Sequence, residues 1–205
     1  SIRRQRQMCI RDSMMIGQQQ KDQAENWFKN LRDKICKEFE ILEEDHLKLS
    51  PKSDVAAKKF ERKSTIRETD DKEDGGGGVM ATLKGGRIFE KVGVNVSAVY
   101  GNLAPEAQKS ITARKAIPEL KDDPRFWASG ISLVAHMRNP HTPAIHLNTR
   151  MFWTPHAWWF GGGTDLNPSI ENDDDTNFFH QILKKKCDKH NPVSYTHLTL
   201  PTNRE

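Results

Sequence analysis

Cysteine is scarce in this chain of 205 residues, which has only Cys9, Cys36 and Cys187. The three residues lie too far apart for the close spacings that bind zinc or form redox pairs, and their scarcity suggests a reducing compartment. Long apolar runs are also missing. No stretch approaches the roughly 18 consecutive apolar residues of a membrane-spanning helix, so we expect no membrane span.

Nucleotide-binding motifs are absent as well. The glycine-rich stretch WWFGGGTD, residues 158–165, lacks the Lys-Ser/Thr pair of a P-loop and the strand–GxGxxG–helix arrangement of a dinucleotide site. We therefore expect no flavin and no nicotinamide cofactor, and we predict a tight turn beside a flat ligand here. Trp158 and Trp159 should point to opposite faces, one into the core and the other toward a pocket.

Both ends of the chain look foreign to the rest. RRQRQMCIRDS at residues 3–13 and VSYTHLTLPT at residues 193–202 can be read from the two strands of one DNA sequence, which resembles a transposase-type sequencing adaptor. We interpret residues 1–13 and 193–205 as adaptor-derived and residues 14–192 as the native segment, and we exclude both flanks from fold reasoning.

Excluding the flanks also removes most of the net charge. The chain has a formal net charge of +4, but residues 1–13 contribute +3 of it through four arginines and one aspartate, and residues 193–205 contribute none. The native segment therefore keeps a net charge of +1. Because this is nearly neutral, it gives no electrostatic reason to expect a nucleic-acid partner.

Apolar residues at helical spacing predict a long amphipathic helix over about residues 18–47, with Cys36 as a core residue beside its stripe. The stripe consists of Trp27, Leu31, Ile35, Phe39 and Leu42. The next stretch, about 48–78, is polar and ends in ETDDKEDGGGG. We expect a mobile loop there, or a backbone that approaches something bulky.

Alternating apolar and polar residues predict strands in the second half of the chain. The alternation covers residues 88–100, with a plausible bulge at Gly93, and continues in GISLVAHM (130–137) and AIHLNTRMF (144–152). A last helix is predicted after an N-cap at Asp175. This order of helix, strands and helix favours an α+β fold with an antiparallel sheet flanked by helices.

Two neighbouring strands should bring a set of polar side chains onto one surface. A symmetric register around residues 137–145 pairs His136 with His146, Val134 with Asn148, and Ser132 with Arg150. Imidazoles move protons near neutral pH and bind first-row metals, whereas a guanidinium binds carboxylates. The surface therefore suits an anionic organic substrate that exchanges protons, with or without a metal.

Five stretches of the native segment resemble the oxygen-dependent coproporphyrinogen III oxidase family and occur in the order of that family. They are GGGG (75–78), FEKVGVNVSAVYG (89–101), FWASGISLVAHMRNPHTPAIHLNTRMF (126–152), WWFGGGTDLNP (158–168) and DTNFFHQILKKKCDKH (175–190). The resemblance implies a flat antiparallel sheet with helices on both sides, a homodimer, and a cytoplasmic enzyme of haem synthesis.

The resemblance also implies a reaction and the residues that perform it. Two propionates of coproporphyrinogen III become vinyl groups of protoporphyrinogen IX, with O2 as acceptor and with release of CO2 and hydrogen peroxide. At the matching positions, His146 is the implied proton donor, and the implied substrate contacts are Ser132, Asn148, Thr149 and Arg150. A divalent metal is possible, and its implied ligands are His136, His146 and His180.

The resemblance stops near residue 192, around the middle of the usual family length. We therefore interpret residues 14–192 as the truncated N-terminal portion of a single oxidase domain. We expect this polypeptide to be insoluble or inactive, because its sheet exposes an edge and an apolar face. Two other classes stay open: a metal hydrolase or dioxygenase ligated by the three histidines, and a non-catalytic tetrapyrrole-binding protein. Tight metal without porphyrinogen turnover would indicate the first, and binding without O2 consumption the second.

Overall fold

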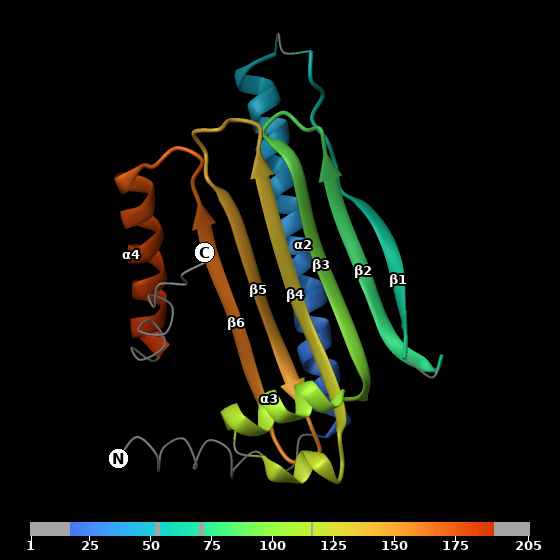
Figure 1. Ribbon diagram of the computed structural model, residues 1–205. Coiled ribbons are helices and arrows are strands. Elements are labelled where there is room, and N and C mark those ends of the chain that lie inside the picture. The colour runs from blue at the N-terminus through green and yellow to red at the C-terminus, as the bar shows by residue number, and fades with distance from the viewer. Residues whose placement is uncertain (1–16, 52–53, 70–71, 116, 191–205) are drawn as a thin grey trace.

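The computed structural model describes residues 17–51, 54–69, 72–115 and 117–190, so both predicted adaptor flanks lie outside the described residues. Six strands form one antiparallel sheet whose order in space follows the sequence (Figure 1). The strands are β1 (Glu61–Glu68), β2 (Asp74–Lys84), β3 (Phe89–Asn102), β4 (Arg125–Met137), β5 (Ala144–Trp153) and β6 (Trp158–Asn167). The helices are α2 (Gln18–Leu49), α3 (Pro105–Lys115), the 3₁₀ helix η1 (Pro118–Lys121) and α4 (Asp173–His190). The predicted α+β fold is confirmed.

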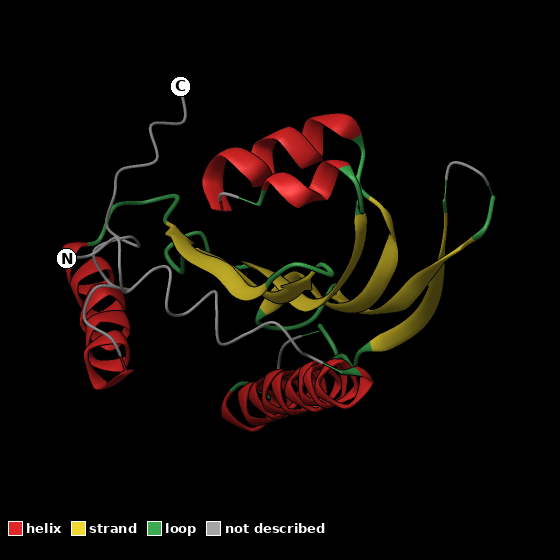
Figure 2. Cartoon of the chain, turned by 90° about the horizontal axis from the view of Figure 1, so that it is seen from below, coloured by secondary structure: helices red, strands yellow, loops and turns green. Residues whose placement is uncertain are grey.

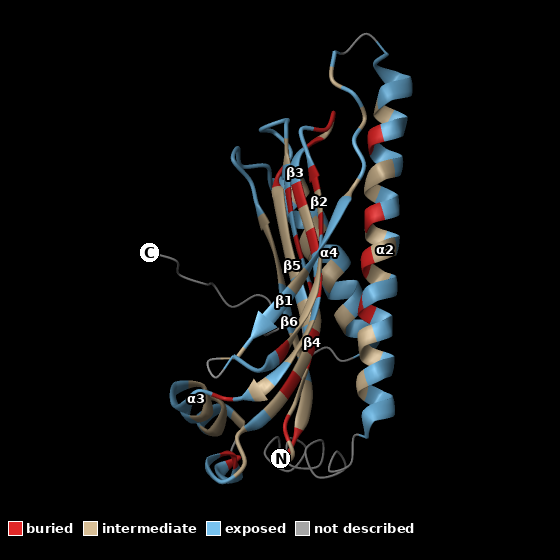
Figure 3. Cartoon of the chain, turned by 90° about the vertical axis from the view of Figure 1, so that its right-hand side faces the viewer, coloured by how far each residue is buried: buried red, intermediate tan, exposed pale blue. Residues whose placement is uncertain are grey.

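Helix α2 runs along one face of the sheet, and the main core lies between them (Figure 3). Leu31, Ile35 and Phe39 pack against this core as predicted. Trp27 and Leu42 do not, because their exposed fractions are 55% and 47%. The fully buried line of α2 passes instead through residues four apart, which include Phe28 and Cys36.

Cys36 is a core residue, as expected from its place beside the stripe. Its exposed fraction is 2%, and it belongs to the same cluster as Val92, Val94 and Leu133 of the sheet. Burial raises the pKa of the Cys36 thiol to about 11. The thiol therefore stays protonated at neutral pH and packs as a small apolar group.

In the part of the chain that the structure describes, the opposite face of the sheet, called the open face below, is covered only at one end. Figure 2 shows α3 and η1 above this face, whereas α2 lies on the other side. A second, smaller core forms beneath them from Leu103, Ile117, Leu120 and Ala157. The rest of the open face carries exposed and half-exposed side chains, so a ligand can reach it.

The glycine run at residues 75–78 lies in strand β2 and is not a loop. Neighbouring strands press on it from both sides: a Cβ at Gly76 would lie 2.2 Å from the carbonyl oxygen of Ala98, and one at Gly77 would lie 2.2 Å from that of Thr65. Gly76 also has a φ of +89°, which favours glycine. The sequence analysis expected a loop or a backbone that approaches something bulky at these glycines, and the structure shows that the neighbour is the backbone of β1 and β3. The preceding polar stretch contains β1, which its sequence did not predict.

Three further details differ from the sequence expectations. The bulge of β3 falls between Phe89 and Lys91, whereas Gly93 pairs regularly. Residues 158–167 form strand β6, so the predicted tight turn is wrong. Helix α4 begins at Asp173, and the side chain of Asn172, not that of Asp175, accepts hydrogen bonds from its first N–H groups.

A buried carboxylate fastens the C-terminal half of α2 to the turn between β2 and β3. Glu43 is fully buried and accepts hydrogen bonds from the backbone N–H groups of Lys58, Arg87, Ile88 and Phe89. Burial alone would raise the pKa of the Glu43 carboxyl, but the four N–H donors outweigh burial and hold the pKa below its ordinary value. Gly86 leaves room for this carboxylate, because a Cβ there would lie 2.5 Å from its Oε1 atom.

Helix α4 stands off the β6 edge of the sheet (Figures 1 and 2), and none of its residues is buried. Phe178 has an exposed fraction of 65%, and Ile182 one of 44%. Among the described helices, none is both long enough and apolar enough to cross a membrane.

Candidate functional site

The candidate site lies on the open face, where strands β3 to β6 run side by side. Residues two apart in a strand share a face, so the buried positions of β4, such as Ile131 and Leu133, place Ser132 and His136 on the opposite, open side. In β5 the same alternation places Asn148 and Arg150 on that side and Met151 in the core. His136 and Arg150 therefore share one face, as the sequence predicts.

The register between β4 and β5 differs from the predicted one by two residues. Val134 lies opposite His146, Ser132 opposite Asn148, and Gly130 opposite Arg150. The connection between the strands is shorter than expected and comprises residues 138–143. Because a shift of two residues keeps every side chain on its face, the predicted set of polar groups is preserved.

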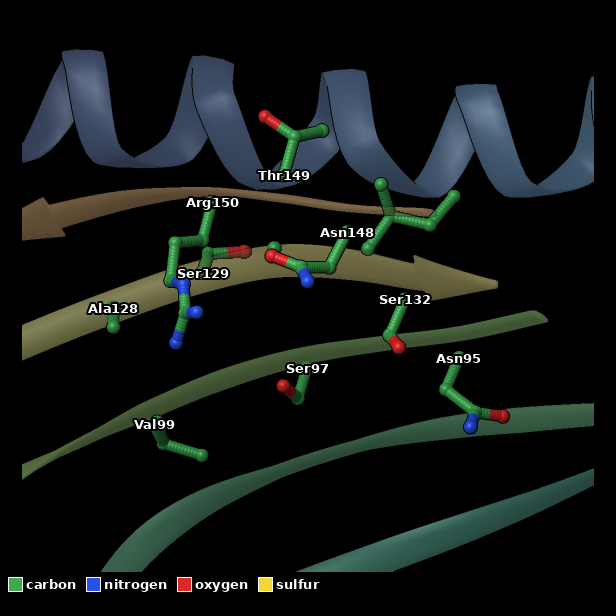
Figure 4. Close-up of a pocket in the computed structure, with 11 residues that line it drawn as sticks. Asn95, Ser97, Val99, Ala128, Ser129, Ser132, Asn148, Thr149 and Arg150 are labelled. Atoms are coloured by element: carbon green, nitrogen blue, oxygen red, sulfur yellow. The ribbon is translucent and has the colours of Figure 1, made fainter. Parts of the chain in front are cut away.

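A hollow of about 340 Å³ lies over these strands. Figure 4 shows that Asn95, Ser97, Ser132, Asn148 and Arg150 project to the same side of the sheet. The cross-strand rows explain this arrangement, because Asn95 lies opposite Ser132 on one side and Asn148 lies opposite Ser132 on the other. Neutral hydrogen-bonding groups thus surround a single guanidinium.

The resemblance to the oxidase family did not identify Asn95 or Ser97 as site residues. Both are polar residues at the exposed positions of an otherwise apolar stretch, NVSAV, with the same two-residue spacing that identified Ser132. Their alternation was visible in the sequence. Only the pairing of β3 with β4 shows that they belong to the same row as Ser132 and Asn148.

His146 lies beside an acidic residue that the sequence analysis missed. The Asp165 carboxylate is 2.9 Å from Nδ1 of His146, and the amide nitrogen of Asn167 donates to the same carboxylate oxygen over 2.6 Å. Thr164 Oγ1 donates to the backbone carbonyl of His146 over 2.8 Å. The amide nitrogen of Asn167 also lies 3.2 Å from Nδ1, so Nδ1 faces β6 and Nε2 is the ring nitrogen on the other side of the imidazole.

Asp165 was missed because residues 158–165 were interpreted as a turn. They form an extended strand instead, and Asp165 lies directly opposite His146. Trp158 and Trp159 point to opposite faces, as predicted, and Trp158 packs against the main core. Trp159 stacks on Phe152 at 4.8 Å and packs against the smaller core instead of lining the hollow.

Thr149, an implied substrate contact, does not share the open face with the other site residues. Its side chain points toward α2, on the other side of the sheet from Asn148 and Arg150 (Figure 4). Thr149 borders the hollow through its place in the strand between these two residues. Only its backbone can therefore face a ligand that lies on the open face.

Of the three implied metal ligands, His136 and His146 lie close together and His180 lies apart from them. The ring centroids of His136 and His146 are 6.0 Å apart, whereas His180 lies on α4, which stands off the β6 edge (Figure 1). Within the described ranges, no group of three or more His, Cys, Asp or Glu residues could hold a metal ion. Nδ1 of His146 also lies 2.9 Å from the Asp165 carboxylate. In the described residues the three histidines thus do not form one cluster, and the metal site stays a prediction.

The fold and the open face together resemble a class of protein in which one side of an antiparallel sheet is left uncovered and carries groups suited to an acidic organic ligand. Arg150 supplies the positive charge, neutral amides and hydroxyls surround it, and the His146–Asp165 pair supplies a group that can transfer a proton. The hollow contains no second guanidinium or ammonium among its lining residues.

Comparison with known proteins identifies the family. The family model described as coproporphyrinogen III oxidase matches residues 23–200, and the chain belongs to this family. Proteins named oxygen-dependent coproporphyrinogen-III oxidase from Rickettsia felis and Rickettsia akari are each 42% identical to it over 175 residues, 85% of this chain. The protein of that name from Rickettsia bellii is 41% identical over 180 residues.

The chain spans only part of these relatives, between 57% and 59% of their length. The family match also reaches residue 200 and so enters the segment 193–205 that we interpret as adaptor-derived. The native boundaries at both ends therefore stay a prediction.

Proposed function

We propose that the protein acts as an oxygen-dependent coproporphyrinogen III oxidase in haem synthesis. In this reaction each of two propionates loses CO2 and becomes a vinyl group, while the two electrons released per propionate pass to O2, which leaves as hydrogen peroxide. The proposal rests on one observation: a chain of this family places a guanidinium, and an imidazole beside a carboxylate, on one open sheet face.

Arg150 is the residue that we assign to a propionate of the substrate. A guanidinium presents two parallel N–H donors to a carboxylate, which fixes its orientation as well as its charge. Ser132 and Asn148 lie in the adjacent row and can hydrogen-bond the same arm or a pyrrole nitrogen. Neutral groups position the substrate without neutralising the carboxylate that must leave as CO2.

His146 is the residue that we assign to proton transfer. Asp165 lies beside Nδ1, so we assign to Nε2 the transfer of a proton from the substrate and back to it. General acid–base groups of this kind typically accelerate a reaction by about 10²- to 10⁴-fold. The reduced porphyrinogen is itself the electron source, so this scheme requires neither flavin nor nicotinamide.

We assign no step to a metal ion, because the described residues bring together only two of the three implied ligands. The homodimer and the cytoplasmic location are proposals that rest on the family resemblance.

Replacement of His146 by alanine tests the function in the full-length protein. We expect kcat to fall by about 10²- to 10⁴-fold in an assay of peroxide release, with the melting temperature unchanged because His146 is half-exposed. His141→Ala, in the exposed turn before β5, is the matched control and should retain activity. An unchanged kcat for His146→Ala would remove the proposed role.

The same assay separates the remaining alternatives. A tetrapyrrole carrier would bind porphyrinogen without consuming O2, and a metal-dependent hydrolase or dioxygenase would retain tight stoichiometric metal without porphyrinogen turnover. Either outcome for the wild-type protein would contradict the proposal.

A further inference from the structure

Three glycines on the open face have no structural reason to be glycine. Within the described residues, a Cβ added to Gly161 or Gly163 would meet nothing within 4 Å, and one added to Gly93 would meet only the amide nitrogen of Asn95, at 3.9 Å. None of the three has the positive φ that favours glycine. Glycine in a strand interior weakens a fold because it loses more conformational entropy than other residues on folding.

Other glycines of the same sheet are explained by packing. A Cβ at Gly162, between Gly161 and Gly163, would lie 2.4 Å from the backbone oxygen of Asn148. A Cβ at Gly130 would lie 2.7 Å from the Cβ of Arg150. The fold itself therefore requires glycine at these two positions, in contrast to Gly93, Gly161 and Gly163.

The three unexplained glycines lie on both sides of the polar groups of β5. In β6, Gly161 is directly opposite Arg150, and Gly163 is directly opposite Asn148. In β3, Gly93 is opposite Val134, which in turn lies opposite His146. At the positions paired across the sheet with Arg150, Asn148 and His146, the backbone of β3 or β6 therefore carries no side chain.

We propose that Gly93, Gly161 and Gly163 determine ligand specificity by leaving the backbone of β3 and β6 bare at these positions, so that a broad ring-shaped ligand can approach these strands closely. A glycine in a strand often marks a place where a ligand approaches the backbone closely. A side chain at these positions would lift such a ligand away from Arg150 and His146. The identification of the ligand as a tetrapyrrole rests on the proposed function. The observation that these three positions carry no side chain is independent of it.

Alanine variants of the full-length protein test this proposal. For Gly161→Ala and Gly163→Ala, we expect an unchanged or higher melting temperature, and a dissociation constant for coproporphyrin III, measured by fluorescence quenching, raised about tenfold or more. KM for coproporphyrinogen III should rise in parallel, and Gly93→Ala should behave in the same way. Gly162→Ala is the matched control: its melting temperature should fall, because its Cβ would meet the backbone of β5.

The outcomes separate this proposal from the proposed function. Dissociation constants within twofold of wild type for both β6 variants would overturn it, even if the wild-type enzyme turns over its substrate. A lower melting temperature for Gly161→Ala and Gly163→Ala would also overturn it, because protein would then cover this surface. Wild-type protein that binds the porphyrin but shows no O2-dependent turnover would refute the oxidase activity, and the binding constants of the variants would still decide the role of the glycines.

Discussion

Asp165 and Asn167 surround one ring nitrogen of His146, at 2.9 and 3.2 Å from Nδ1. A histidine is useful as a base only if its free nitrogen faces the substrate, and a hydrogen bond at the other nitrogen fixes which one is free. Asp165 is therefore a positioning residue in our scheme, since it acts through His146.

Replacement of Asp165 by asparagine should lower kcat by about 10- to 100-fold and leave KM nearly unchanged, because the carboxylate that orients the imidazole is lost while Arg150 still binds the substrate. Steady-state kinetics on the full-length protein measures both parameters. A variant with a normal kcat, or one whose only change is a lower melting temperature, would show that Asp165 is purely structural.

Replacement of Arg150 by lysine should raise KM by about tenfold, because an ammonium cannot reproduce the paired N–H donors of a guanidinium. The matched control is Arg114→Lys, on the exposed surface of α3, for which we expect an unchanged KM. Equal KM values for Arg150→Lys and wild type would refute the assignment of Arg150 to a substrate carboxylate.

At the scale of elements, the attachment of α2 to the sheet depends on both apolar packing and the Glu43 carboxylate. Arg87 reinforces this attachment: it is buried, its Nε atom donates to Nδ1 of His46 over 3.3 Å, and its guanidinium also donates to the backbone oxygens of Ser50 and Val55. The turn between β2 and β3 is thereby held against the C-terminal half of the helix, at the end of the strand pair that carries Asn95.

Replacement of Glu43 by alanine should lower the free energy of unfolding by about 3 kcal/mol or more, because several backbone N–H groups would be left buried without an acceptor. Chemical denaturation measures this change. Glu44→Ala is the control: Glu44 is half-exposed and faces Lys59 at 3.7 Å, so it should change stability by at most about 1 kcal/mol. Similar losses for both variants would contradict the proposed role of Glu43.

The Glu43 carboxyl also predicts a pH dependence of stability. Its pKa is lower in the folded protein than the ordinary value of 4.5, so its contribution is fully present above that value and is lost as the pH falls through the folded-state pKa. Unfolding curves between pH 7 and pH 3 should therefore show a larger loss of stability for wild type than for Glu43→Gln. Parallel curves would contradict this prediction.

At the scale of the whole molecule, large surfaces of the described chain are uncovered. The open face is bare except beneath α3 and η1, β6 is an edge strand, and Phe178 and Ile182 of α4 are exposed. Exposed strand edges and apolar patches promote association. These surfaces are consistent with a chain that spans little more than half the length of its relatives.

We therefore expect residues 14–192, expressed alone, to aggregate and to show no peroxide release, whereas the full-length protein should be monodisperse and active. Size-exclusion chromatography and the peroxide assay test both parts of this prediction. A monodisperse, active preparation of residues 14–192 would contradict it.

The sequence by itself determined the α+β class, the alternation of β3, β4 and β5, and the shared face of Ser132, His136, His146, Asn148 and Arg150. These predictions succeeded because the two-residue period of a strand is local, so a shift of the register by two residues left every side chain on its face. The family resemblance was also visible in the sequence, in long uninterrupted stretches.

Only the tertiary structure decided which distant residues meet. Asp165 meets His146, and Asn95 joins Ser132 and Asn148, through strand pairings between separate segments of the chain. The glycine-rich stretches at 75–78 and 161–163 looked like a loop and a turn, because glycine has no side-chain pattern that indicates a strand. Their role became evident only from the distances between each glycine and its neighbouring backbone, which local sequence does not determine.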